Sequence, residues 1–170
     1  KTKAPKCTED AANHPYIRGN APPKTEDEMK RICGYDNYVH YAATDHALSQ
    51  AVGDNRVTHV LVTNGDNAYS PNFMSRAVKA DVDVVFGDFL TQGNRVTAEV
   101  KLGYVDLGGV VVRRDFLVGH GVRFLNSLPK SHADSAKDVH DADFWYLRRL
   151  VKRLHAKVKI LHDEVLFYHH

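Results

Sequence analysis

A short polar turn, Asn64-Gly65-Asp66-Asn67, follows an apolar run and carries oxygen-bearing side chains that suit a cation. The run before it, Thr58–Thr63, is nearly continuous in apolar character and predicts a parallel strand buried on both faces. Ligands of open α/β sheets bind at the carboxyl ends of such strands. The side chains of Asn64 and Asp66 are close enough in sequence to face one ligand, and their oxygens suit Mg²⁺ or Mn²⁺ bridging to substrate phosphates. Gly65 leaves room for a phosphate or a metal ion to approach the backbone. An Asx-rich turn that satisfies only backbone groups is the alternative interpretation.

Two further acids, Asp141 and Asp143, open a predicted amphipathic helix. Carboxylates at a helix N-terminus are stabilised by the macrodipole and by free N–H groups, so plain capping is one interpretation. The same environment keeps a carboxylate ionised and fixed in place, as a general base must be. The helix itself is predicted by an apolar stripe at three- and four-residue spacing, formed by Phe144, Leu147, Leu150, Val151 and Leu154.

The stretch Val60–Phe73 resembles the DXD region of GT-A-fold glycosyltransferases, in which an apolar strand leads into an acidic turn, a Pro and an aromatic residue. By this resemblance Asp66 takes the place of the second acid of the motif, the usual metal–diphosphate ligand. Asn64 stands where the first acid normally is, which removes one negative charge from the implied metal site. Together with Gly65 and Asn67 these residues form the implied cofactor-binding turn.

Later segments resemble the same family in the same order. His140-Asp141-Ala142-Asp143 is similar to the "ED" motif of inverting GT-A enzymes, which implies that Asp141 is the catalytic base; His140 replaces the preceding Glu. Val105–Leu117 resembles the small-residue strand and helix between the two motifs. There Gly108 and Gly109 would let a donor or acceptor sugar approach the backbone, and a bulge in a strand is the alternative.

The end of the chain, Leu166–His170, resembles a late Tyr/His element that supplies a metal ligand in some members of the family. This resemblance implies that His169 joins Asp66 and Asn64 as a metal ligand. A disordered end or the remnant of a purification tag is the alternative interpretation of the terminal His-His pair.

The elements that must position these residues alternate between helix and strand, which is typical of an α/β sheet with crossover connections. We therefore expect a GT-A-like (Rossmann-like) fold with a mixed, mainly parallel sheet flanked by helices. The predicted helices cover residues 25–34, 45–52, 72–78, 115 to 119 or 121, and a segment starting near 141; the predicted strands cover 38–43, 58–63, 81–86 (broken at Gly87-Asp88), 96–105, 107–112, 158–161 and 165–168.

The chain has 170 residues, which predicts one domain. We divide it into a loop-rich N-terminal segment (1–34), a metal and nucleotide-sugar half (35–95) and an acceptor and catalytic-base half (96–170). Hydrophobic residues make up 43% and charged residues 26%, as in ordinary globular proteins. The formal net charge of +2 argues against a protein that binds nucleic acid through bulk charge, and no apolar stretch is long enough to predict a transmembrane helix.

The two cysteines, Cys7 and Cys33, leave the compartment open. A bridge between them would imply an oxidising environment such as the lumen of the secretory pathway, whereas two free thiols fit the cytoplasm equally well. We expect a soluble chain in either case.

These observations predict a glycosyltransferase that uses Mn²⁺ or Mg²⁺. It would move a sugar from a UDP- or GDP-type nucleotide-diphosphate sugar to a hydroxyl of a carbohydrate or glycoconjugate, with inversion. His40 and Asp45 are expected to approach the donor. The alternatives are a non-catalytic nucleotide- or carbohydrate-binding domain of the same fold, another α/β metal-dependent phosphate enzyme such as a nucleotidyltransferase or phosphatase, and a plain structural domain.

Overall fold

The computed structural model describes residues 36–63, 67–91, 93–128 and 141–168. The helical elements are α3 (Asp36–Gly53), α4 (Phe73–Lys79), η1 (Leu107–Gly109), α5 (Arg114–His120), η2 (Leu125–Ser127), α7 (Ala142–Arg148) and η3 (Arg149–Arg153), of which η1 and η2 are 3₁₀ helices and η3 is π-helical. The strands are β1 (His59–Leu61), β2 (Asn67–Tyr69), β3 (Val84–Thr91), β4 (Asn94–Val96), β5 (Val110–Arg113) and β6 (Val158–Tyr168). The N-terminal segment 1–34, with its predicted helix and both cysteines, lies outside the described residues.

The strands form one mixed sheet in the order β1-β5-β3-β6-β2, with β4 paired to β3 outside this path. Strands β3 and β6 are parallel, whereas β1–β5, β3–β5, β2–β6 and β3–β4 are antiparallel. The mixed α/β class is therefore confirmed, but the expectation of a mainly parallel sheet is wrong for the described strands. A parallel connection needs a crossover, usually a helix, and residues 97–106, which lead from β4 toward β5, form turns and bends instead.

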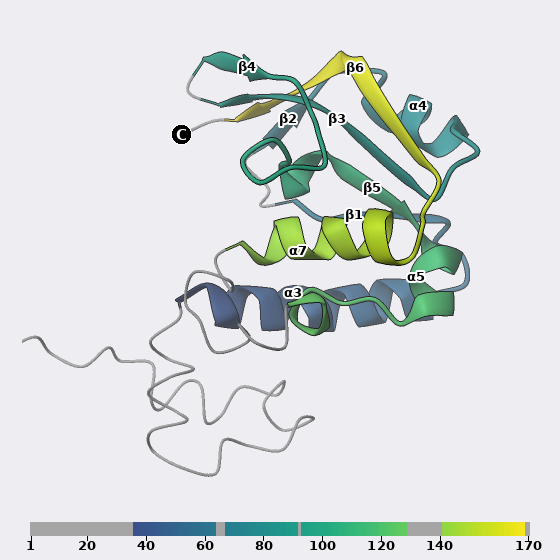
Figure 1. The fold of residues 1–170 in the computed structure, drawn as a ribbon. Helices are drawn as coiled ribbons and strands as arrows, with labels where there is room; N and C mark the ends of the chain where they lie inside the picture. The colour runs from purple at the N-terminus through teal and green to yellow at the C-terminus, as the bar shows by residue number, and fades with distance from the viewer. Residues whose placement is uncertain (1–35, 64–66, 92, 129–140, 169–170) are drawn as a thin grey trace, which may run out of the picture.

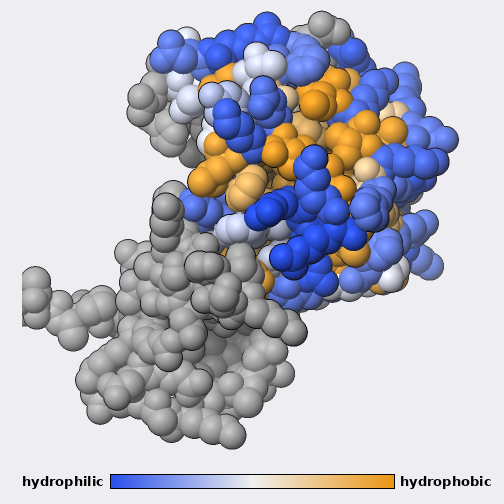
Figure 2. Space-filling model, viewed as in Figure 1, coloured by the Kyte–Doolittle hydropathy of each residue, from blue (hydrophilic) through white to orange (hydrophobic). Residues whose placement is uncertain are grey.

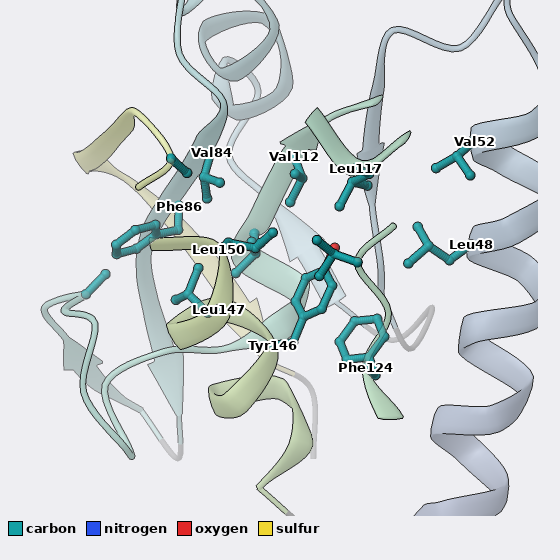
Figure 3. Close-up of a cluster of buried hydrophobic side chains, with 14 residues drawn as sticks. Leu48, Val52, Val84, Phe86, Val112, Leu117, Phe124, Tyr146, Leu147 and Leu150 are labelled. Atoms are coloured by element: carbon teal, nitrogen blue, oxygen red, sulfur yellow. The ribbon is translucent and has the colours of Figure 1, made fainter. Parts of the chain in front are cut away.

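Helices cover both faces of the sheet (Figure 1). On one face, Phe86 of β3 and Val112 of β5 pack in the same buried cluster as Leu147 of α7 (Figure 3). On the opposite face, Phe73 of α4 packs against Val85 of β3. Successive side chains of a strand point to opposite faces, so the uninterrupted apolar run in β3 supplies both clusters. Because β5 lies between β1 and β3, strands from the predicted halves 35–95 and 96–170 share one sheet.

Helix α3 replaces the strand predicted for Tyr38–Ala43, and that prediction is wrong. The buried positions Ala42, Asp45, Leu48 and Val52 recur at three- and four-residue spacing, as the inner face of a helix requires. The buried carboxylate at Asp45 interrupts the apolar stripe, which made the sequence look like a strand followed by a helix start. The predicted end of this helix at Gly53 is confirmed.

Two further strand predictions need correction. Only β4, which ends at Val96, represents the strand predicted for 96–105, because the chain then turns at Gly103, whose φ of +81° favours glycine. The predicted break at Gly87-Asp88 is also wrong, since β3 continues to Thr91. The irregularity lies in the pairing with β6, whose register shifts between Gly87 and Asp88, and β6 is one strand rather than the two predicted.

Several predicted elements are confirmed. Strand β1 forms within 58–63, although it is half-buried and pairs antiparallel rather than being a parallel strand buried on both faces. Helix α4 follows Pro71, and α5 ends at Gly121, whose φ is +57°. Helix α7 begins after Asp141. In the region of this helix, Figure 2 shows hydrophilic side chains beside hydrophobic ones. Among the described residues, no helix combines the length and apolar character needed to cross a membrane.

Candidate functional site

A cavity of about 640 Å³ opens at the edge of the sheet where β1 ends. Strands β1, β3 and β6 run in the same direction, as their pairings require, so their carboxyl ends share this edge with the start of β5. The N-terminal half of α3, the residues after β1, the segment entering η1 and the first turn of α7 form the walls. Polar side chains line it at His40, Tyr41, Thr44, Thr63, Asp106 and Asp143, and Gly108 completes one wall.

The wall formed by η1 is held by hydrogen bonds to both backbone groups of Gly108. Its N–H donates to Asp106 Oδ1 at 2.7 Å, and its carbonyl oxygen accepts from Tyr69 Oη at 2.9 Å. Gly109 is buried beside it and donates its N–H to the Asp106 carbonyl at 3.0 Å. Gly108 lines the cavity, whereas Gly109 is not among its described lining residues. Sequence analysis missed Asp106, although an Asp two residues before a glycine is a recognisable capping signal.

The two acids at the start of α7 occupy different positions. Asp141 is the N-cap residue and is half-buried. Asp143, two residues further along the chain, lines the cavity. Its Oδ1 accepts a hydrogen bond of 2.7 Å from the N–H of Phe144. Of the predicted acid pair, the structure therefore brings Asp143 to the cavity wall and places Asp141 beside it.

The pKa of Tyr41 reflects both its burial and the negative charges around the cavity. Burial is the largest cause that raises the pKa of its phenol, and the negative charges of Asp143, Asp141 and Asp106 raise that pKa further. Three carboxylates that are far from Tyr41 in sequence thus raise the pKa of this one side chain. The Tyr41 hydroxyl consequently stays protonated at neutral pH, and the carboxylates give the cavity the hydrogen-bond acceptors that a substrate hydroxyl needs.

Two residues expected near the donor separate in the structure. His40 lines the cavity. Asp45 is buried in α3 and accepts hydrogen bonds from the N–H groups of Phe124 at 2.7 Å and Leu125 at 3.1 Å. Burial raises the pKa of Asp45 despite these bonds. Its side chain fastens η2 to α3, so the prediction that Asp45 approaches a donor is wrong.

The predicted metal ligands Asn64, Asp66 and His169, and the predicted cofactor-binding residue Gly65, lie outside the described residues. The described residues next to Asp66 and His169 in sequence are Asn67 and Tyr168, which form a backbone pair between β2 and β6. Asn67 Nδ2 donates to Thr63 Oγ1 at 3.2 Å.

The amide oxygen of Asn67 is a buried acceptor that has no hydrogen-bond partner in the described part of the chain. Within the ranges described, no group of three His, Cys, Asp or Glu side chains could hold a metal ion. A metal site at this edge would therefore need ligands from outside the described ranges.

The fold and the cavity define a mixed α/β domain with a carboxylate-lined cavity at one edge of its sheet. No family model matches the chain, and no curated protein and no solved structure matches it either. The function must therefore be argued from the cavity and the residues around it.

Proposed function

We propose that this chain is a metal-dependent glycosyltransferase that transfers a sugar, with inversion, from a UDP- or GDP-type nucleotide-diphosphate sugar to a hydroxyl of a carbohydrate or glycoconjugate. The observation that carries the proposal is the pairing of Asn67 with Tyr168. From this pair the chain continues directly to Asp66 at one strand and to His169 at the other. Two candidate metal ligands, about a hundred residues apart, are thus each adjacent in sequence to one member of this backbone pair.

The donor atoms suit the metal. Asp66 and Asn64 offer oxygen ligands and His169 an imidazole nitrogen, a set compatible with Mn²⁺ or Mg²⁺. The buried amide oxygen of Asn67 adds an oxygen of the type that coordinates such a cation. When bound, the metal ion supplies Lewis-acid stabilisation of the departing diphosphate.

The remaining steps use side chains at the cavity. The acceptor hydroxyl oxygen attacks the anomeric carbon, the bond from that carbon to the diphosphate oxygen breaks, and the hydroxyl proton passes to a carboxylate. We assign this base to Asp141, with Asp143 on the cavity wall as the alternative base. The backbone at Gly108, which lines the cavity, allows close approach of a sugar because glycine has no side chain there.

The test measures Mn²⁺ binding by calorimetry and Mn²⁺-dependent transfer from a panel of UDP- and GDP-sugars. Asp66→Ala should abolish both, and His169→Ala should weaken Mn²⁺ binding at least about tenfold, a typical effect of disturbing a metal site. Asp81→Ala, which removes a carboxylate whose side chain is 98% exposed, is the matched control and should bind Mn²⁺ as the wild type does.

Undiminished Mn²⁺ binding by Asp66→Ala would refute the metal site. Binding of a nucleotide diphosphate without any transfer would instead identify a non-catalytic binding domain. Turnover of phosphate esters without sugar transfer would identify another metal-dependent phosphate enzyme.

A further inference from the structure

We infer that the acceptor of the proposed transfer is amphipathic: its sugar enters the polar cavity, and an apolar chain attached to that sugar lies in a groove between α3 and β1. The role of this ligand as acceptor rests on the proposed function, whereas the binding of an apolar chain in the groove is testable without any transfer.

The groove has a volume of about 300 Å³ and a mainly apolar lining. Ala47, Leu48 and Ala51 of α3 line one side, and Val60 and Leu61 of β1 line the other. Strand β1 is the last strand at its end of the sheet order and pairs with β5, so no described strand covers its other edge. The groove is therefore a space between a helix and a sheet edge that an elongated molecule fits.

The floor of the groove belongs to the hydrophobic core. Leu48 is a member of the large buried cluster, and it points from α3 toward that cluster in Figure 3. Val60 packs against the same cluster but is only half-buried, as is Leu61, and Ala47 is exposed. A hydrocarbon chain in the groove would remove this remaining apolar surface from water, which is the main favourable term in the binding of apolar groups.

The groove and the carboxylate-lined cavity are continuous. Thr44, Val62 and Thr63 line both of them. On the cavity side the lining includes Asp106 and Asp143, whereas alanine, leucine and valine prevail on the groove side. Sugar hydroxyls in the groove would lose water without gaining hydrogen-bond partners, which is costly. The two linings together therefore fit a sugar that carries an apolar chain better than they fit a longer free carbohydrate.

The junction between groove and cavity does not oppose the passage of an apolar chain. The Thr44 hydroxyl donates to the His40 carbonyl oxygen at 2.8 Å. Thr63 Oγ1 accepts from Asn67 Nδ2 at 3.2 Å. Covering a polar group is costly when that group has no hydrogen bond, and both hydroxyls at the junction already have one within the protein.

The experiment measures the binding of methyl, hexyl and octyl glucoside to the full chain by NMR, with each probe below its micelle concentration. The affinity should rise about twofold to fourfold for each methylene that enters the groove. The shift changes caused by octyl glucoside should include the methyl groups of Leu48 and Val60. In the transfer assay, kcat/KM for the three acceptors should rise in the same order.

Two variants of α3 form a matched pair. Ala47→Phe places an aromatic side chain at the groove and should lower the affinity for octyl glucoside at least about tenfold, because several methylenes lose their contacts. Gln50→Phe adds the same side chain at an exposed position of the same helix that is not among the described lining residues of the groove or the cavity, and it should bind octyl glucoside as the wild type does. Wild-type amide shifts in β3 and β6 show that each variant is folded.

Equal affinities for methyl and octyl glucoside, undetectable binding of octyl glucoside, or equal losses in the two variants would overturn the groove as a binding site. A dimer of the wild type with Leu48 and Val60 in its interface would assign the groove to a second copy of the chain and overturn it as well.

A kcat/KM that does not depend on chain length, despite chain-length-dependent binding, would overturn the role of the ligand as acceptor. Absence of transfer from every nucleotide sugar would refute the proposed function, and the binding series would then decide the groove by itself.

Discussion

Tyr69 Oη donates a 2.9 Å hydrogen bond to the carbonyl oxygen of Gly108. This bond joins β2, which begins at Asn67, the last residue of the predicted metal-binding turn, to the wall of the cavity. The Tyr69 ring also stacks on Phe73 of α4 with a centroid distance of 5.7 Å, which limits its movement. Strand β2, the glycine wall and α4 are therefore connected through one side chain.

We predict that Tyr69→Phe lowers the free energy of unfolding by about 0.5–1.5 kcal/mol, the usual contribution of one hydrogen bond. Because the Gly108 carbonyl loses its partner at the cavity wall, donor affinity should fall as well. Urea unfolding and calorimetric titration with a nucleotide diphosphate and Mn²⁺ measure the two effects. The control Tyr104→Phe alters a tyrosine that is 38% exposed and should change neither value; equal behaviour of the two variants would contradict the prediction.

The assignment of the base leads to a second prediction. Asp141→Asn should leave donor binding intact and lower kcat by about 10²–10⁴-fold, the range typical of general-base assistance. Single-turnover transfer with saturating donor measures this loss. Asp115→Asn on α5, whose side chain is 82% exposed, is the control and should retain wild-type kcat.

Asp143→Asn decides between the two acids, because Asp143 rather than Asp141 lines the cavity. A large loss of kcat in Asp143→Asn together with full activity of Asp141→Asn would transfer the base role to Asp143. Wild-type kcat in both variants would remove the first turn of α7 from the mechanism.

A third prediction concerns acid stability and the buried carboxylate Asp88. Burial by itself would raise the pKa of Asp88, but hydrogen bonds from the N–H of Ala98, the guanidinium of Arg95 and the ring of His162 outweigh it and lower that pKa. A carboxyl whose pKa is lower in the folded than in the unfolded chain stabilises the fold above its unfolded pKa of about 3.9. That contribution is lost as the pH falls from about 4 through the folded pKa.

The free energy of unfolding of the wild type should therefore decrease as the pH falls through this range, and Asp88→Asn should show a shallower decrease. At neutral pH the same variant should be less stable by about 1–3 kcal/mol, because it disturbs a buried hydrogen-bonded charge. Urea unfolding at a series of pH values measures both effects. Asp81→Asn should keep the wild-type slope, and a wild-type slope in Asp88→Asn would contradict the assignment.

Asp45 and Asp88 also explain where sequence reasoning failed. Each is a buried acid on an otherwise apolar face, and the sequence pattern predicts the start or the end of an element at each. Their hydrogen-bond partners lie far along the chain, such as Phe124 for Asp45 and His162 for Asp88. Periodicity registers only the polarity of a residue and not the distant group that satisfies it, so both elements were interrupted in the prediction.

Elements with unbroken patterns were predicted well. The helix after Pro71 and the helix ending at Gly121 form where expected. The run at 58–63 contains β1, although this strand is half-buried and pairs antiparallel. Local propensity and punctuation by Pro and Gly are sufficient for such elements, because the signals lie within a few residues of the structure they specify.

The sequence alone therefore determined the mixed α/β class and the acids that open α7. Only the tertiary structure decided that β5 lies between β1 and β3, that β6 pairs with β2, and that Tyr41, Asp106 and Asp143 meet at one cavity. The reason is physical: strand order, pairing direction and the packing of α3 against α7 depend on contacts between distant parts of the chain, which no local pattern of residues contains.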